Sequence, residues 1–201
     1  IQGLNHLYIV PEKNEKQKIA QEAIDPQKQE KIKEIATNNL ICYSDTIPVD
    51  VFELARINRL ILVPYSKLTA YELNKLQNKY NAISKDGFLF WGKNRENLRG
   101  FIYYDDSLNP QRVRFTIMHE IGHYLLKHYE ISDLAEAEAN FFAKFLLAPP
   151  ILVHLIKPTD YMEIAETFDV SHEFAYNAFV YYQKWLNTKR RNNKIIGRIG
   201  C

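Results

Sequence analysis

Apolar residues recur at helical spacing along most of the chain, and the clearest case is the segment 112–126. Its apolar side chains have the spacing of a helix with one buried face: Phe115, Met118, Leu125 and Leu126. Asn109 and Pro110 fit the N-cap and the first residue of this helix. A second long helix is predicted over Ser132–Leu147, because apolar periodicity continues there until Pro149.

Shorter apolar runs before residue 110 predict strands instead of helices. They are bounded by Gly, Pro and Asp residues and are rich in β-branched and aromatic side chains: Leu60–Val63, Phe88–Trp91 and Phe101–Tyr104. Helices are predicted around them, from Asp50 through Ile57 and over Thr69–Lys79. The fold class is therefore α+β, with a small mixed or antiparallel sheet and a mostly helical C-terminal half.

The two ends of the chain are predicted to differ from its centre. Residues 1–46 are dense in Lys, Glu and Gln, and Pro26 divides them, so we expect an N-terminal extension folded as a helical hairpin. Residues 47–187 form the main domain. Residues 188–201 carry five basic side chains and no acidic one, which predicts a basic flexible tail.

The main domain ends in a helical pair, predicted at Tyr161–Phe168 and His172–Leu186. Its spacing resembles that of a DNA-binding helix-turn-helix unit, but such pairs are common packing units. The second helix is not basic, and the net charge of the chain is only +2. Direct binding to nucleic acid is therefore not expected.

Composition also limits the cellular setting. The chain has 201 residues, of which 46% are hydrophobic, and two cysteines, Cys42 and Cys201. Two cysteines give no disulfide framework, which suits a reducing compartment. No apolar run reaches the length of a membrane span, and no signal-peptide pattern is present. We expect a cytoplasmic protein with no membrane partner.

The first predicted helix contains the sequence His119-Glu120-Ile-Gly-His123. Residues four apart share one face of a helix, so His119 and His123 can direct their imidazoles to one point and bind zinc. Glu120 lies about 100° around the helix, where it can reach a water in the site and act as general base. This pattern predicts a catalytic Zn²⁺ site.

A third ligand must come from elsewhere. The metzincin pattern is excluded, because Tyr129 stands where it needs its third His. His128 would lie on the opposite side of a continued helix. A carboxylate of the second helix is left, either Glu136 or Glu138, and helical geometry alone does not choose between them.

The segments Arg114–Leu126 and Glu136–Pro149 resemble the ImmA/IrrE family of zinc metallopeptidases, and the resemblance extends over about 47–186. It implies a zincin-like, gluzincin-type peptidase in which His119, His123 and a downstream glutamate bind zinc and Glu120 is the base. The family's ligand glutamate lies thirteen residues before a helix-ending proline, which implies Glu136, with Glu138 as the alternative.

The resemblance also implies a partner. Members of the family cleave helix-turn-helix repressors of mobile elements or stress genes, so we expect a protein substrate of this kind and a role in transcription regulation. Two other classes stay open: a zinc-binding module that associates with a repressor or antitoxin without proteolysis, and a hydrolase of a non-protein substrate. The intact Glu120 argues against the first, since a binding module needs no general base.

Phe101–Tyr104 is predicted to bind an extended substrate at a sheet edge.

Overall fold

The computed structural model describes residues 24–41, 47–79, 86–93, 98–130 and 132–199. The described helices are α2 (Pro26–Ile41), α3 (Val51–Ile57), the short 3₁₀ helix η1 (Tyr65–Lys67), α4 (Ala70–Lys79), α5 (Pro110–Leu125), α6 (Asp133–Leu147), α7 (Pro150–Ile156), α8 (Tyr161–Phe168) and α9 (His172–Ile199). The strands are β1 (Ile61–Pro64), β2 (Gly87–Lys93) and β3 (Leu98–Tyr104). The prediction of a mostly helical α+β fold is confirmed.

The three strands form one mixed sheet in the order β1-β3-β2. β1 runs parallel to β3, and β2 runs antiparallel to it with Leu89 opposite Ile102. Since β3 is paired on both sides, the prediction that Phe101–Tyr104 offers a free edge to a substrate is wrong. In the described sheet the free edges belong to β1 and β2.

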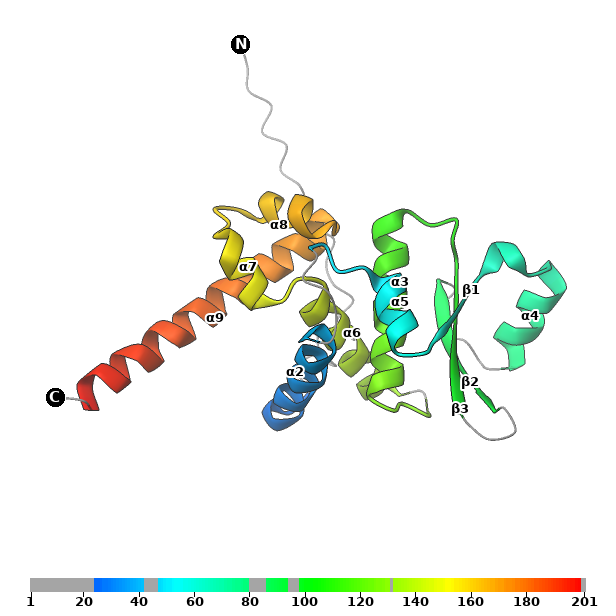
Figure 1. Cartoon of the computed structure of the whole chain (residues 1–201), viewed down its shortest axis with the longest axis horizontal. Coiled ribbons are helices and arrows are strands. Elements are labelled where there is room, and N and C mark those ends of the chain that lie inside the picture. The colour runs from blue at the N-terminus through cyan, green and yellow to red at the C-terminus, as the bar shows by residue number, and fades with distance from the viewer. Residues whose placement is uncertain (1–23, 42–46, 80–85, 94–97, 131, 200–201) are drawn as a thin grey trace, which may run out of the picture.

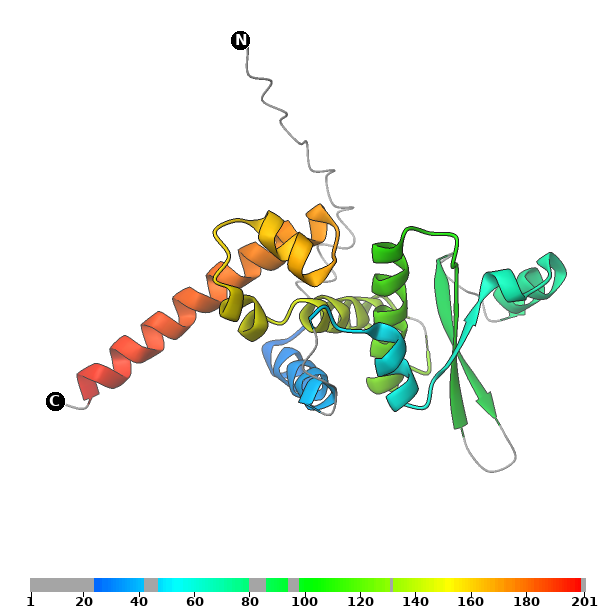
Figure 2. The same ribbon diagram turned by 45° about the horizontal axis from the view of Figure 1, so that its top comes forward.

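Helix α5 packs on one face of this sheet, and α4 lies on the other side in both views (Figures 1 and 2). Glycine lets α5 approach closely. A Cβ on Gly100 would lie 2.4 Å from a Leu60 methyl and 2.8 Å from the ring of Tyr124 on α5. Ile102, in the middle of β3, is completely buried beneath the helix layer. The sheet is thus a rigid platform for α5.

Helix α6 covers the opposite side of α5, and their tight contact depends on Gly122. A Cβ on Gly122 would lie 3.0 Å from Phe142 and 3.3 Å from the backbone of Ala139. The role of this glycine in the structure is to bring the two helices together. Around it the core is closely packed by fully buried side chains: Ile117, Met118, Ile121, Phe142 and Leu146.

Helix α2 is the described part of the N-terminal extension. Its buried residues Ile32 and Ala36 belong to the same core as α5 and α6, and the helix lies beside α6 (Figure 1). The other half of the predicted helical hairpin lies outside the described residues. The predicted boundary at residue 46 stays a prediction, but residues 26–41 share the core of the main domain.

The C-terminal helices are tied to α5 by one guanidinium. Arg114 donates hydrogen bonds to the backbone carbonyls of Val49, Phe168 and Asp169, and it forms an ion pair with the Asp169 carboxylate at 2.6 Å. Asp169 has a φ of 48°, so the chain turns sharply between α8 and α9. One buried cation therefore fixes α3, α5 and the α8–α9 turn together.

Helix α9 continues through Ile199 and projects from the body of the molecule (Figure 2). The prediction that residues 188–201 lack regular structure is therefore wrong for 188–199. The dense basic composition suggested a coil, but the sequence contains no proline after Leu186 that would break the helix.

The run Asp133–Ile156 is long and apolar enough to span a membrane by composition alone. It comprises α6 and α7, which are separated at Ala148 and Pro149, and half of its most apolar window is buried inside the protein. A core helix of a globular protein passes the same test, so this run is not evidence of a membrane protein.

Candidate metal centre

The centre is built from the first half of α6 and the second half of α5. Both helices start at side-chain caps: Asn109 accepts a hydrogen bond from the backbone N–H of Arg112, and Ser132 accepts one from Ala135. These caps fix where each helix begins, and therefore which residues face the neighbouring helix. His119 and His123 face α6, one helical turn apart on α5.

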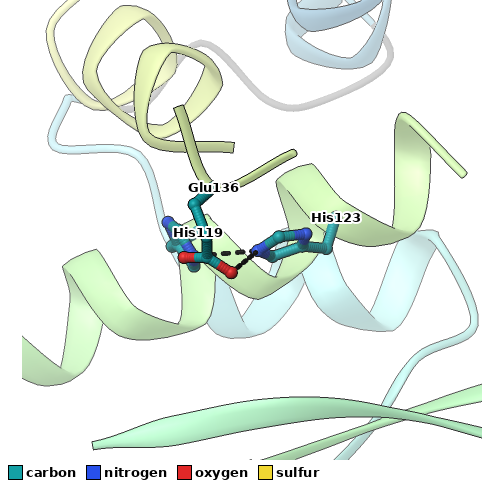
Figure 3. A group of neighbouring side chains, drawn as sticks. All are labelled: His119, His123 and Glu136. Atoms are coloured by element: carbon teal, nitrogen blue, oxygen red, sulfur yellow. Dashed lines mark hydrogen bonds and ion pairs between the residues drawn. The ribbon is translucent and has the colours of Figure 1, made fainter. Parts of the chain in front are cut away.

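Glu136 reaches from α6 to both rings (Figure 3). Its Oε2 lies 3.2 Å from Nε2 of His119, and its Oε1 lies 3.2 Å from Nε2 of His123. The two Nε2 atoms are 3.0 Å apart. Among the described residues these three form the group of His, Cys, Asp and Glu side chains that could hold a metal ion.

The spacing of these ligand atoms fits a tetrahedral metal ion. Zinc bonds of about 2.0–2.1 Å to imidazole and carboxylate place two ligands about 3.3–3.4 Å apart. The observed separations of 3.0 to 3.2 Å are close to this, and each of the three residues offers a ligand atom within 4.8 Å of the other two. Three ligands leave the fourth position of a tetrahedral ion free for water or substrate, as in catalytic sites.

The charges within this cluster are strongly coupled. Burial alone would raise the pKa of Glu136, but its contacts with His119 and His123 hold it well below the usual range for a glutamate. Burial lowers the pKa of His119, and the neighbouring Glu136 and Glu120 more than offset this, so its pKa is raised. Without a metal, the cluster therefore favours an ionised Glu136 carboxylate beside a His119 ring whose protonated form is stabilised.

Asn140 lies one turn after Glu136 on the face toward His119. Its amide is close enough to favour the protonated His119 ring, although Nδ1 of His119 has no hydrogen bond of good geometry within the described residues. The Asn140 side chain therefore lies beside a candidate metal ligand.

Glu120 lies on the sheet side of α5 and is buried. Burial raises the pKa of its carboxyl group, while His119 and His123 oppose that rise and the backbone N–H of Leu89 donates a hydrogen bond to it. A carboxylate in contact with the sheet and electrostatically coupled to the histidine cluster is suited to accept a proton in the site. The part played by Leu89 could not be found from the sequence, because a backbone donor has no side-chain signature.

A family model with the description "IrrE N-terminal-like domain", of the peptidase M78 family, matches residues 61–179. This match covers more than half of the chain and includes His119, His123 and Glu136. The chain belongs to the peptidase M78 family. Within the curated proteins no sequence matches it.

Membership in the M78 family carries direct consequences for the centre. The family implies a metallopeptidase, and hence a protein substrate. Together with the cluster of two histidines and a glutamate, it points to a bound metal ion. The predicted resemblance to the ImmA/IrrE peptidases is thereby confirmed.

In this M78 domain the other candidate glutamate, Glu138, has different partners. Its side chain is only 4% exposed and lies 2.9 Å from the Nζ atom of Lys28 on α2. Nε2 of His128 lies 3.0 Å from the same carboxylate oxygen. With both partners already in place, Glu138 belongs to a buried ion pair and has no place in the metal cluster.

His128 itself is not where the sequence placed it. We assumed that the helix continues beyond Leu126, which would carry His128 to the opposite side. Instead α5 ends at Leu125, and Lys127 adopts a φ of 59°, which returns the chain toward the helix. Burial lowers the pKa of His128 despite the nearby Glu138, which favours its neutral form.

Proposed function

We propose that this protein is a zinc-dependent metallopeptidase that cleaves a helix-turn-helix repressor or a similar regulatory protein. The observation that carries the proposal is the convergence of His119, His123 and Glu136 beside the buried carboxylate of Glu120. Two imidazoles and one carboxylate are a donor set typical of catalytic zinc. The arrangement is that of a gluzincin-type, zincin-like site.

The residues of the chain have distinct roles in this proposal. His119, His123 and Glu136 hold the ion, which when bound supplies a Lewis acid that polarises a peptide carbonyl and acidifies water. Glu120 takes a proton from the attacking water and passes it to the amine that leaves. In the metal-free protein, burial raises the pKa of the Glu120 carboxyl group above its usual value.

We further propose that the substrate binds as an extended strand along the outer edge of β2. This edge is free of strand partners in the described sheet, and the N–H of Leu89 on β2 already reaches the Glu120 carboxylate. A peptide paired with β2 would therefore pass directly by the proposed base. This role replaces the one predicted for Phe101–Tyr104.

A cytoplasmic location and a role in regulating mobile-element or stress genes belong to the same proposal. They rest on the composition of the chain and on the resemblance of its motifs. No direct contact with nucleic acid is required, because the substrate is the repressor itself.

The test is cleavage of a purified helix-turn-helix repressor encoded next to this protein, with and without a metal chelator. Wild-type protein should produce defined fragments, and chelator should abolish them. Glu120→Gln should keep the metal and the fold but lose activity by roughly 10²–10⁴-fold, the usual contribution of a general base. Undiminished cleavage by Glu120→Gln would contradict the role of Glu120 as the general base. Stoichiometric binding without any cleavage by the wild type would favour the non-proteolytic alternative.

A further inference from the structure

Behind His123 lies a chain of polar contacts that extends away from the proposed metal cluster. Nδ1 of His123, on the opposite side of the ring from Glu136, is 3.0 Å from Nδ1 of His128. Nε2 of His128 is 3.0 Å from Oε2 of Glu138, and the same oxygen is 2.9 Å from Nζ of Lys28. Four side chains from three helices and the turn after α5 are thus connected in one line.

The hydrogen-bond directions along this line are consistent with only one arrangement when Nε2 of His123 is a metal ligand. That nitrogen then uses its lone pair, so the ring proton is on Nδ1 and is donated to His128. Nδ1 of His128 must accept, which places the His128 proton on Nε2, where it is donated to Glu138. Lys28 donates a second hydrogen bond to Glu138, so every donor has an acceptor.

The backbone holds His128 in this position from two directions. Its N–H donates to the carbonyl oxygen of His123 at 3.0 Å, and its own carbonyl accepts a hydrogen bond of 3.3 Å from the indole of Trp91. The His128 side chain is only 10% exposed. A histidine that was merely exposed on a turn would need none of these restraints.

We propose that His128 is a positioning residue for the metal centre, held in turn by Glu138 and Lys28. His128 fixes the tautomer and the ring orientation of His123, so that Nε2 of His123 is held in the rotamer that points to the cluster. Because Lys28 lies on α2, the N-terminal extension becomes a functional part of the site. This inference rests on the proposed function only in that His123 is a metal ligand.

Zinc affinity of the full-length protein, measured by competition with a chromophoric chelator, tests this role directly. His128→Phe keeps an aromatic ring but removes the acceptor, and it should weaken zinc binding by about 10-fold or more. His128→Asn retains an oxygen near the position of Nδ1, and it should restore most of the affinity. If the role of His128 were purely structural, zinc affinity would not fall in His128→Phe and recover in His128→Asn.

The absorption spectrum of the cobalt-substituted protein gives a second measurement that does not depend on catalysis. His128→Phe should change the visible cobalt bands, since a freely rotating His123 alters the ligand field. Lys28→Met, at a side chain that is 39% exposed, should give a smaller effect in the same direction. It also tests the line of contacts if His128→Phe fails to fold.

The matched control is His154, a partly buried histidine on α7. Its Nδ1 lies 3.0 Å from the Tyr182 hydroxyl. His154→Phe should change thermal stability but leave zinc affinity and the cobalt spectrum as in the wild type. A folded His128→Phe with wild-type affinity and spectrum would overturn the positioning role alone. Failure of the wild type to bind zinc or cobalt would instead overturn the proposed function.

Discussion

Two glutamates that are two residues apart on α6 lie in contrasting surroundings. On what we call the open side, Glu136 is 34% exposed and contacts only the ring nitrogens of His119 and His123 among its described ionic partners. On the closed side, Glu138 is 4% exposed and is paired with His128 and Lys28. The two sides meet at His123, whose ring has one nitrogen facing each.

The difference shows how one helix can carry a carboxylate that is able to bind a metal ion and another that is already paired. A buried carboxylate is stable only when a cation and hydrogen-bond donors compensate it, and the closed side supplies both. The open side leaves Glu136 with two imidazoles that are able to bind a metal and with access to solvent. A metal ion can therefore enter on one side, while the other side holds the geometry constant.

The largest expected effect separates the two glutamates directly. Glu136→Gln should weaken zinc binding by about 100-fold or more, because it removes a charged ligand, whereas Glu138→Gln should cost about 10-fold at most. Metal content and chelator competition measure both. If Glu138→Gln loses zinc and Glu136→Gln retains it, the third ligand is Glu138 and the contrast between the sides is reversed.

Removal of the metal should affect the open side only. The apoprotein should keep its helix content, because the buried contacts between α5 and α6 do not require an ion. Its stability should fall by the binding linkage, about 4 kcal/mol when free zinc is 1,000 times its dissociation constant. Circular dichroism and thermal unfolding with and without chelator check this, and added zinc should restore the melting temperature. Loss of the helical circular dichroism signal on addition of chelator would show that the metal has a structural role.

The close contact between α5 and α6 can be tested at Gly122. Alanine favours a helix by about 1 kcal/mol over glycine, but its Cβ would press on Phe142 and on the backbone of Ala139. Overpacking of this kind costs about 1–3 kcal/mol, so Gly122→Ala should lower stability slightly and separate α5 from α6. Zinc affinity should fall as Glu136 is displaced. If Gly122→Ala is more stable and binds zinc as the wild type does, α5 and α6 can accommodate the added methyl group.

The smallest effect concerns Glu120 in the metal-free protein. Burial raises its pKa above the unfolded value, so folding is penalised as pH rises through the range between those two pKa values. Glu120→Gln removes the penalty and should stabilise the apoprotein by about 1 kcal/mol near pH 7. The gain should disappear as pH falls toward about 4.3, where the unfolded carboxyl is itself protonated. Thermal unfolding of both proteins across this range measures it, and a gain independent of pH would exclude the charge as its cause.

Glu136 contributes with the opposite sign in the same titration. Its pKa is lowered in the folded state, so its stabilising effect is present above the unfolded value and is lost as pH falls toward the folded one. Glu136→Gln should therefore destabilise the apoprotein at neutral pH, where Glu120→Gln stabilises it. The pair of variants thus separates a ligand carboxylate from a buried base by stability alone.

The local elements of this protein followed from its sequence because their signals are local. Helical periodicity, the cap at Asn109 and the prolines after Leu147 determined α5 and α6 to within one residue at most ends. The four-residue spacing of His119 and His123 fixed their common face, since helix geometry depends on nothing else. The extent of β2 and β3 was underestimated, because polar residues at strand ends carry no alternating pattern.

What only the tertiary structure decided were the contacts between elements that are distant in sequence. Both Glu136 and Glu138 are on α6, and the choice between them depends on how α6 crosses α5 at Gly122 and on the presence of Lys28 over a hundred residues earlier. The turn at Lys127 brought His128 back to His123, because a single residue with positive φ redirects the chain and leaves no periodic trace. Sequence patterns report which face a residue occupies on its own helix; which partner that face meets is determined by packing.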